Sequence, residues 1–532
     1  MKNTKNIPII DLFAGPGGLA EGFSSLVNSS NERFFNVKLS IEKDADAHKT
    51  LKLRSFLRQF PLNELPDEYY DFLKQNISIE NLFSSYPEEN KEAEKEAWQA
   101  TLGITSNAEI DERIVEGLAG EKDWVLIGGP PCQAYSLVGR SRVGGIDKDD
   151  HRVLLYKEYL RIIAVHQPAI FVMENVKGLL SAKVEGEKVF DNIMADLQDP
   201  SSVFEEHPGS KYKIYSLVKS NVKTDSDYLI KSELYGIPQK RHRVILLGIR
   251  DDISVEPGTL ALHKEVILKS VINDLPKVRS GLYREFVGSE DIIADGVVKK
   301  KRYYRTVKDN YVEWSRLVTR YANDLNELLP DDFRTEGDLP KTIGAEYLPA
   351  QESIPTDHPL YTWYNDEKMD GVVNHVSRGH LTQDLKRYLF SSLYTRNFNK
   401  FPRMDDFRAY GADLVPDHES AESGKFSDRF RVQVPNTAAT TVTSHISKDG
   451  HYFIHYDPLQ CRSLTVREAA RIQTFPDNYF FCGSRTQQFH QVGNAVPPYL
   501  AYQISEVVLD MLQKYSLSFI TGNLSERTAI VS

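Results

Sequence analysis

One cysteine, Cys132, stands where a nucleophile would be useful. It ends the turn Gly128-Gly129-Pro130-Pro131-Cys132, which directly follows the apolar run 124–127. Prolines stiffen the backbone, and ligands of α/β sheets bind at the carboxyl ends of the strands. A free cysteine is commonly a small buried hydrophobe, but such a residue seldom sits in a stiff Pro-Pro turn. We therefore interpret Cys132 as a nucleophile that reacts as its thiolate.

A carboxylate, Glu174, ends a second apolar run at residues 169–173. Burial behind apolar residues raises the pKa of a carboxyl group toward the range in which it can donate a proton. The alternative is a surface glutamate that caps the next segment, and Glu174 taken alone favours neither. Its place at a strand end beside Cys132 favours catalysis.

A basic motif, Gln239-Lys240-Arg241-His242-Arg243, precedes a further apolar run. If it enters a strand, the period of two places Gln239, Arg241 and Arg243 on one face. Two guanidinium groups and an amide converging on one pocket suit a planar polar ligand with a carbonyl group and nearby phosphates. The alternative is an arginine-rich edge strand in water.

A glycine loop near the start of the chain has the spacing Gly15-x-Gly17-x-x-Ala20. It follows the apolar run 7–12, and Glu42 ends the next strand-like run, where a carboxylate can hold ribose hydroxyl groups. This pattern fits NAD, FAD or an adenosyl sulfonium equally well. A tight strand-to-helix turn without a ligand is the alternative.

These residues need a sheet to bring them together. Apolar runs separated by helix-sized segments predict a parallel α/β sheet, with strands at residues 7–12, 35–41, 124–127, 169–173 and 244–248. The pattern stops near residue 276, and the aromatic, proline-rich sequence to about 435 predicts a second domain. Thr465-x-x-Glu468 is a capping box that predicts a helix ending near residues 475–476. A last helix, about 499–514, is expected to pack on the core.

Composition excludes several classes of protein. The chain has 532 residues, of which 41% are hydrophobic and 26% charged, as in ordinary globular proteins of two to four domains. It has neither a bilayer-length apolar run nor a signal peptide, which indicates a cytoplasmic protein. Three cysteines (Cys132, Cys461 and Cys482) make no disulfide framework and no Cys-x-x-Cys zinc pair, so no metal is expected.

The net charge of −10 is unevenly distributed. Residues 61–130 contain sixteen acidic and five basic residues, so the rest of the chain is close to neutral. Clustered Glu, Lys, Ala and Leu predict that this tract is a mainly helical insertion, at about residues 50–120. The basic run 299–305 is interleaved with aromatic residues, as a surface that follows a nucleic-acid backbone requires, although a solvated loop is the simpler interpretation.

Taken together, the motifs resemble those of the DNA (cytosine-5) methyltransferase family of the bacterial or phage restriction-modification type. Six blocks occur in that family's order, at residues 11–18, 129–133, 174–176, 239–243, 462–477 and 491–498. The resemblance covers the catalytic core but neither the acidic insertion nor residues 276–435.

The resemblance implies a Rossmann-like S-adenosylmethionine-dependent core in residues 1–275 and a smaller target-recognition domain in 276–440. Residues 441–532 would return to complete the catalytic domain. The cofactor S-adenosylmethionine would be held by Phe13, Ala14, Gly15, Gly17, Gly18, Leu19, Glu42, Leu155, Asn494 and Val496, with Phe13 stacking on the adenine and Glu42 holding the ribose.

The resemblance also implies a reaction on a cytosine flipped out of duplex DNA. Cys132 would add to C6, Glu174 would supply a proton at N3, and Arg243 would hold the base carbonyl. Arg241 and Gln239 would support this site. Partners would be double-stranded DNA and a cognate restriction endonuclease that forms no stable complex, and the enzyme would be a monomer.

Three other functions are possible from the sequence. A tRNA cytosine methyltransferase shares the Pro-Cys-Gln motif, but the long segment before the Thr465 helix favours duplex DNA, which needs a recognition surface. A dinucleotide oxidoreductase would use the glycine loop but would leave Cys132, Glu174 and Arg241 unexplained. A catalytically silent DNA-binding protein would not need Cys132 and Glu174.

Candidate DNA contacts fall in the second domain. We expect phosphate contacts from the basic run and base contacts from polar residues later in the domain. The expected phosphate-binding residues are Lys299, Lys300, Lys301, Arg302 and Arg305, and the expected base-reading residues are Arg378, His380, Arg387 and Arg396. An acidic surface repels phosphate, so we expect the insertion to face away from DNA.

Overall fold

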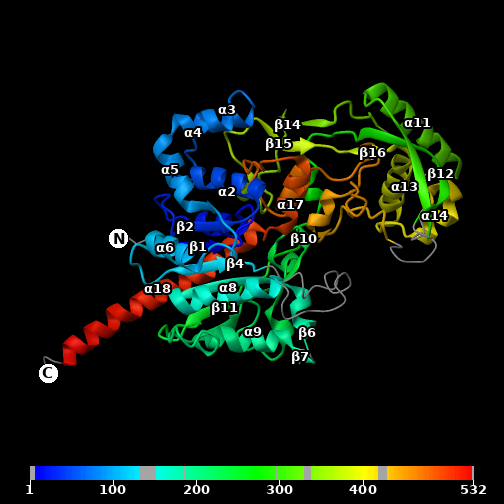
Figure 1. The fold of residues 1–532 in the computed structure, drawn as a ribbon. Helices are drawn as coiled ribbons and strands as arrows, with labels where there is room; N and C mark the ends of the chain where they lie inside the picture. Colours follow the sequence, from blue (N-terminus) through cyan, green and yellow to red (C-terminus); the bar gives the residue numbers. More distant parts are fainter. Residues whose placement is uncertain are drawn as a thin grey trace.

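A twisted eight-stranded sheet forms the centre of the first part of the chain (Figure 1). The computed structural model describes residues 6–130, 151–184, 186–294, 297–328, 337–350, 352–416 and 428–529. The strand order is β3-β2-β1-β4-β5-β11-β8, with β9 also paired to β11. The strands are β1 (Ile7–Leu12), β2 (Phe35–Glu42), β3 (Ala97–Gln99), β4 (Val125–Gly128), β5 (Ile170–Val176), β8 (Tyr212–Ser216), β9 (Leu229–Lys231) and β11 (His242–Arg250).

The sheet is parallel from β3 to β5 and antiparallel beyond it. Strands β1 to β5 pair in parallel, as the sequence predicts, whereas β11 runs antiparallel to β5, β8 and β9. The expectation of a wholly parallel sheet is therefore wrong for β11. Only residues 232–241 join β9 to β11. That connection is shorter than the crossover of a dozen or more residues that parallel neighbours need.

Helices cover both faces of this sheet. On one face, α6 (Asn107–Leu118), α8 (His151–His166) and α9 (Val189–Gln198) share an apolar core with the strands. On the other face lie α1 (Gly18–Ser24) and α18 (Pro498–Ala529), which is the long red helix in Figure 1. The last helix thus packs on the core as predicted, and it extends beyond the predicted end near residue 514.

The acidic insertion is mainly helical, as predicted. It contains α3 (Asp67–Leu73), α4 (Ile79–Ser85) and α5 (Pro87–Glu96), which follow α2 (Ala45–Leu57). Strand β3, which adds an edge strand to β2, was not predicted from the sequence. Helix α3 also reaches the second part of the chain. Tyr70 donates a hydrogen bond to Asp366 at 2.8 Å, and Lys74 pairs with Asp370 at 2.7 Å.

The second part of the chain has an apolar core of its own, around Trp314 and Tyr388. Its longest strands, β12 and β13, form an antiparallel hairpin, so the interpretation of the basic run 299–305 as a loop is wrong. The elements are β12 (Gly281–Ala294), β13 (Val297–Thr306), α11 (Tyr311–Leu328), β14 (Gly344–Pro349), α12 (Tyr361–Tyr364), β15 (Gly371–Val376), β16 (Gly379–Leu381), α13 (Thr382–Phe398) and α14 (Met404–Tyr410).

A third apolar core joins the two parts. It combines α10 (Lys269–Ile272) with side chains from α12, β15 and the segment 439–495. That segment contains β17 (Ala439–Thr440), α16 (Val466–Ile472) and α17 (Arg485–Asn494), and β17 pairs with β10 (Gln239–Lys240).

The small hairpin of β6 (Lys183–Val184) and β7 (Glu187–Lys188) lies at the edge of the first part. No helix in the described ranges is long and apolar enough to span a bilayer.

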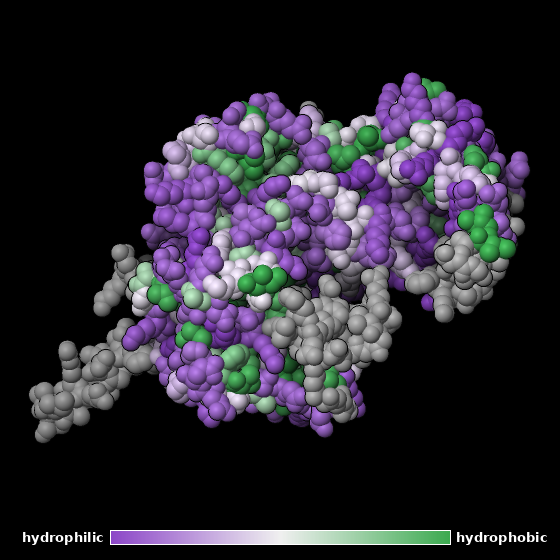
Figure 2. Space-filling model, viewed as in Figure 1, coloured by the Kyte–Doolittle hydropathy of each residue, from purple (hydrophilic) through white to green (hydrophobic). Residues whose placement is uncertain are grey.

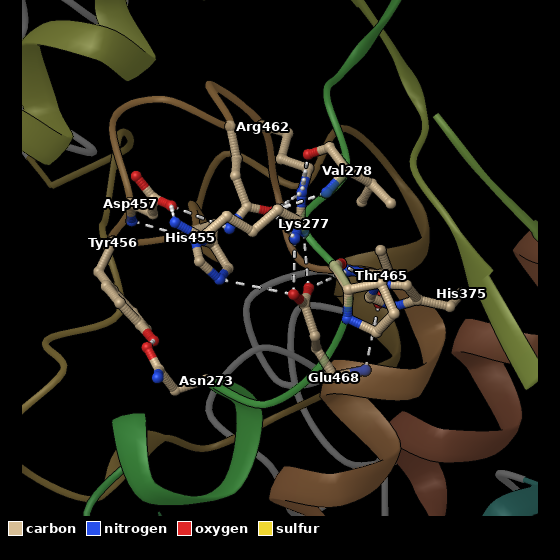
Figure 3. Close-up of polar contacts among 12 residues, drawn as sticks. Asn273, Lys277, Val278, His375, His455, Tyr456, Asp457, Arg462, Thr465 and Glu468 are labelled. Atoms are coloured by element: carbon tan, nitrogen blue, oxygen red, sulfur yellow. Dashed lines mark hydrogen bonds and ion pairs between the residues drawn. The ribbon is translucent and has the colours of Figure 1, made fainter. Parts of the chain in front are cut away.

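The capping box of α16 is the centre of a buried polar network at this junction (Figure 3). Thr465 caps the helix and Glu468 returns the bond to its backbone, as the sequence predicts, although the helix ends at Ile472, before the predicted residues. Arg462 binds Glu468 through both terminal nitrogens, at 2.6 and 2.7 Å. His375 joins the network by contacting the Thr465 hydroxyl at 2.9 Å.

Two histidines make this junction sensitive to acid. Burial lowers the pKa of both His375 and His455 to about 4. The unfolded chain, with a histidine pKa near ~6.5, therefore binds more protons than the folded chain between those values, and stability falls as the pH drops through this window. Between pH 7 and pH 5 we expect the free energy of unfolding to fall by about 2 kcal/mol for each histidine.

Urea unfolding at the two pH values measures this loss. His375→Gln should lower stability at pH 7 but should make its pH dependence shallower by about 2 kcal/mol. His263→Gln, a change at an exposed position, is the matched control and should leave the pH dependence unchanged. An equally steep dependence in wild type and His375→Gln would contradict the prediction.

Candidate active site

Four parallel strands bring their carboxyl ends to one edge of the sheet. The glycine loop follows β1, Glu42 ends β2, Gly129 follows β4, and Glu174 lies near the end of β5. Because β1 pairs with both β2 and β4, and β4 pairs with β5, these segments are neighbours. The sequence predicted this arrangement, and ligands of such sheets bind at this edge.

Glu42 holds the glycine loop in place. One carboxylate oxygen accepts a hydrogen bond from the amide of Gly15 at 2.8 Å, and the other accepts from the amide of Asp44 at 2.8 Å. The loop contains left-handed residues at Phe13, Gly15 and Gly17, with φ of 56°, 57° and 95°. A Cβ on Gly15 would meet no atom within 4 Å, so the loop has open space in front of it.

The return segment closes over this loop from the far end of the chain. A Cβ on Gly18 would lie 2.4 Å from the carbonyl oxygen of Val496, so only glycine allows the two backbones to approach. Tyr479 donates a hydrogen bond to the carbonyl of Pro16. Leu19 contributes its buried side chain to the core shared with Val496.

Sequence reasoning missed the groups behind the loop. Arg54 binds Glu21 at 2.5 Å, both side chains are buried, and the guanidinium lies 4.5 Å from the ring centre of Tyr479. These three residues therefore couple α1, α2 and the return segment. The sequence does not indicate this buried ion pair, because charged residues on short helices are usually exposed.

The remaining residues expected to bind a cofactor differ in their surroundings. Phe13 and Leu155 belong to one apolar cluster, in which Phe13 is partly exposed. The amide of Ala14 donates to the carbonyl of Ile41 at 3.1 Å. Asn494 is exposed at the end of α17. A partly exposed aromatic ring, an open glycine turn and a carboxylate on the second strand fit an adenosine and its substituent.

Glu174 forms an ion pair with Arg243. Their strands are antiparallel neighbours, and Nε of Arg243 lies 2.6 Å from Oε1 of Glu174. The two side chains are only 14% and 16% exposed, so this pair is shielded from solvent. A Cβ on Gly129 would lie 3.0 Å from Oε2 of Glu174. Glycine at 129 therefore lets the carboxylate lie against the backbone that leads toward Cys132.

Gln239 and Arg241 bind the return segment. The Gln239 amide donates to the carbonyl of Ile472 at 3.1 Å and accepts from the amide of Val442 at 3.0 Å. Arg241 donates to the carbonyls of Val442 and Gly493, at 2.8 and 3.2 Å. Burial, reinforced by Arg243, lowers the pKa of Arg241 well below its usual range.

These contacts correct one expectation. Gln239, Arg241 and Arg243 do not present all their polar groups to one ligand, because Gln239 and Arg241 use theirs within the chain. The strand also breaks at Arg241, between β10 and β11, so the period of two does not run through the motif. Arg243 alone of the three contacts Glu174.

Cys132 lies outside the described residues, so its role as a nucleophile stays a prediction. The other two cysteines are buried. Burial raises the pKa of the Cys482 thiol to about 12 and that of the Cys461 thiol further still. Neither supplies a thiolate at neutral pH. Across the ranges that the structure covers, no cluster of His, Cys, Asp and Glu could hold a metal ion.

Two of the expected base-reading residues, Arg378 and His380, are buried, and the partly buried Arg387 uses its guanidinium within the protein, which contradicts that role. Arg378 donates to the carbonyls of Ile446 and Lys448, at 2.7 and 2.8 Å. His380 is 5% exposed, and Arg387 donates to Asp384 at 2.8 Å. Polar residues with partners inside the protein cannot reach a base edge. Sequence reasoning failed here because polar composition does not distinguish a buried network from a recognition surface.

Most described side chains of the β12–β13 hairpin beyond Leu282 are exposed or partly exposed, and Arg396 is exposed. Lys300, Lys301, Arg302 and Arg305 lie on this hairpin, and the side chain of Lys299 lies outside the described ones. Tyr303 is 39% exposed and Ile293 is 80% exposed. Figure 2 shows hydrophobic atoms gathered at the same end of the molecule, near β12 and α14. Basic and aromatic residues thus share one surface.

Comparison with known proteins identifies the family. The model of the C-5 cytosine-specific DNA methylase family matches residues 74–510. The chain belongs to this family. It is a DNA (cytosine-5-)-methyltransferase, which explains why the blocks from Gly129 to Pro498 occur in one order. The sequence-based assignment is therefore confirmed.

Relatives of this methyltransferase cover nearly the whole chain. Type II methyltransferase M.Bpa9945I of Bacillus paralicheniformis is 30% identical over 95% of this chain and 99% of its own. Type II methyltransferase M.DdeI of Desulfomicrobium norvegicum is 27% identical over 94% of this chain and 87% of its own. Type II methyltransferases are the methylating enzymes of restriction-modification systems, so the methyltransferase is of that type.

A solved structure shares the fold. A protein assigned as a DNA modification methyltransferase, encoded within an Escherichia coli prophage, aligns with a TM-score of 0.50 at 18% identity. The alignment covers 96% of this chain and 100% of that one. The methyltransferase thus has the expected Rossmann-like α/β fold.

Proposed function

We propose that the methyltransferase transfers the methyl group of S-adenosylmethionine to C5 of a cytosine flipped out of a specific duplex sequence. The observation that carries this proposal is the Glu174–Arg243 pair, which lies against Gly129 at the sheet edge that also bears the glycine loop. A cytosine in a stacked duplex could not reach groups held at such an edge, so the base must leave the helix.

Cys132 acts as the nucleophile in this proposal. Cytosine C5 is too weak a nucleophile to accept a methyl group directly, and addition of a thiolate to C6 makes C5 resemble an enamine carbon. Cys132 is three positions after Gly129, and three residues span at most about 10 Å. Cys132 is therefore tethered within reach of a base held by Glu174. After methyl transfer a base takes the C5 proton, the C5–C6 double bond re-forms and the C6–sulfur bond breaks, which restores the thiolate.

Glu174 and Arg243 handle the polar edge of the base. Addition at C6 creates negative charge at N3, and Glu174 in its protonated form donates the proton or hydrogen bond that N3 then needs, which leaves a carboxylate that pairs with Arg243. Arg243 holds the base carbonyl and orients Glu174 through their ion pair. Gln239 and Arg241 are positioning residues, because their hydrogen bonds fix the return segment next to β11.

The cofactor site consists of the glycine loop and its surroundings. When bound, S-adenosylmethionine supplies an electrophilic methyl group. Phe13 stacks on its adenine, Glu42 holds the ribose while fixing Gly15, and Leu155 contributes an apolar wall. The backbone of Ala14, Gly15, Gly17, Gly18 and Leu19, with Asn494 and Val496, completes the site. The open space in front of Gly15 supports this assignment.

Removing the Phe13 ring should act on cofactor affinity. Stacking of an aromatic side chain on a base is worth roughly 1–3 kcal/mol, so Phe13→Ala should weaken S-adenosylhomocysteine binding roughly 5- to 150-fold. Calorimetric titration measures the change. Phe398→Ala, a change at an exposed ring on the second part, is the matched control. Unchanged affinity in Phe13→Ala would show that the ring does not stack on the adenine.

DNA binds, we propose, between the catalytic domain and a target-recognition domain in residues 276–440. The exposed basic and aromatic hairpin β12–β13 is the recognition element that the structure favours, because a two-stranded ribbon fits the major groove. Residues 441–532 complete the catalytic domain. The enzyme works as a cytoplasmic monomer beside a cognate endonuclease, with which it forms no stable complex.

Base-resolution sequencing of 5-methylcytosine tests the function. DNA from cells that express the protein should carry 5-methylcytosine at one short sequence, and DNA from cells without it should not. Purified protein should transfer labelled methyl groups from S-adenosylmethionine to DNA of that sequence. Transfer to tRNA with none to DNA would overturn the proposal.

A further inference from the structure

A groove beside the Glu174 site is lined by residues that have no role in the proposed reaction. Its volume is about 770 Å³, and it is formed by the segments after β5 and β8, by β9 and by the turn that follows β9. Strand β8 runs parallel to β5, since both are antiparallel to β11. The groove therefore opens at the same edge of the sheet as Glu174.

Three lysines from three different segments line the groove. They are Lys177, Lys219 and Lys231, and all three are exposed. Lys219 pairs with Asp227 at 2.7 Å. Neither Lys177 nor Lys231 forms an ion pair within the described part of the chain. In a protein of net charge −10, this groove is a site of uncompensated positive charge.

Apart from Ser181, Ser226, Asp227 and Gly178, the rest of the groove lining is apolar or aromatic. Leu229 and Tyr235 are buried, Leu180 is partly buried, and Leu234 is 46% exposed. A nucleic-acid strand offers the complementary chemistry, because its phosphates attract lysine ammonium groups while its sugars present carbon atoms to apolar side chains. A free phosphate ion would use the lysines and leave the apolar surface unexplained.

The distance between Glu174 and the groove is consistent with one DNA strand that contacts both. Lys177 follows Glu174 by three residues, which is about 10 Å at the rise of a β-strand. Phosphates follow one another every ~3.4 Å of helix axis along each strand of DNA. A groove that begins about 10 Å from the flipped base therefore lies beside the phosphates of the next few nucleotides.

We propose that this groove binds the sugar-phosphate backbone of the target DNA beside the flipped cytosine. Lys177 and Lys231 contact phosphates, and Leu180 and Leu234 contact the sugars between them. The inference rests on the proposed function, since it takes Glu174 as the residue that meets the cytosine. It adds a DNA contact on the catalytic domain to the contact expected from the β12–β13 hairpin.

The salt dependence of DNA binding tests the groove. The probe is a duplex centred on the cytosine that sequencing shows to be methylated, with binding followed by fluorescence anisotropy. Each lost phosphate contact reduces the slope of log K against log salt by about 0.9. The Lys177→Ala/Lys231→Ala variant should therefore show a slope about 1.8 units shallower than wild type. Lys177→Arg/Lys231→Arg should retain the wild-type slope.

A matched control separates a local contact from a loss of total charge. Lys95→Ala/Lys514→Ala removes two exposed lysines that lie outside the groove and pair with Glu92 and Asp510, and it should leave the slope unchanged. Lys219→Ala should have a smaller effect than Lys177→Ala, because Asp227 already neutralises Lys219.

Trimming the duplex gives a second measurement. Shortening one flank to end beside the methylated cytosine should weaken binding by wild type but not by the Lys177→Ala/Lys231→Ala variant. Equal salt slopes and equal trimming effects in both proteins would overturn the groove proposal. Wild-type protein that binds and methylates no DNA would instead overturn the proposed function, so the two failures are distinguishable.

Discussion

Replacing Cys132 with serine should abolish methyl transfer while leaving cofactor binding intact. A serine hydroxyl is not ionised at neutral pH and is a far weaker nucleophile than a thiolate. The expected loss is at least as large as that seen when other covalent enzymes lose their nucleophile, on the order of 10⁴-fold or more. Transfer of labelled methyl groups to DNA measures the rate, and calorimetry with S-adenosylhomocysteine measures cofactor binding.

The other two cysteines provide the control. Cys461 and Cys482 are buried and their thiol pKa values are raised, so Cys461→Ser/Cys482→Ser should remain active if it folds. DNA with 5-fluorocytosine at the target position should trap the enzyme, because fluorine at C5 cannot leave as a proton does. Mass spectrometry should find the adduct on Cys132. An adduct on Cys461 or Cys482 would refute the assignment.

Glu174→Gln should lower the rate of methyl transfer roughly 10²- to 10⁴-fold, the usual contribution of a positioned acid or base. The amide keeps the size of the side chain but loses the ion pair with Arg243 and the capacity to deliver a proton to N3. Because that proton is needed only as charge develops on the base, DNA affinity should change much less than the rate. Single-turnover kinetics and anisotropy measure the two quantities.

Glu42→Gln is the comparison for this experiment. Glu42 is a carboxylate at a neighbouring strand end, but it bonds to the glycine loop, so its loss should weaken cofactor binding instead. A Glu174→Gln variant that loses DNA binding and turnover in equal measure would show that Glu174 has a structural role only. Arg243→Lys should lower the rate of methyl transfer less than Glu174→Gln does and more than Glu42→Gln does, since lysine keeps the charge but not the planar geometry.

The sequence determined the family of the protein and most of the strands that carry the candidate site. Strand β1 spans the predicted residues, and Glu42 and Glu174 end or nearly end their strands as expected. These predictions succeed because buried parallel strands are short apolar runs, which are visible in the sequence, and because polar residues after such runs gather at one sheet edge. The capping box at Thr465 is equally local, and it too was predicted.

Only the tertiary structure decided which polar residues face a ligand and which hold the chain together. Arg243 pairs with Glu174, whereas Arg241, two residues earlier, bonds to carbonyls near Gly493. Arg378 and His380 looked like base-reading residues but are buried in the junction between the two parts. Burial depends on contacts between segments far apart in the chain, and side-chain type alone does not encode them.

The direction of β11 and the closure of the return segment over the glycine loop likewise depend on the tertiary structure. An apolar run predicts a strand but not its direction, which the short connection after β9 imposes. Gly18 looked like a ligand-binding glycine, and the structure adds that its missing side chain admits the backbone of Val496. The sequence thus predicts the candidate reacting groups, because residue types and local order are visible in it. The tertiary structure specified their partners, because contacts over hundreds of residues create the buried surroundings in which those groups act.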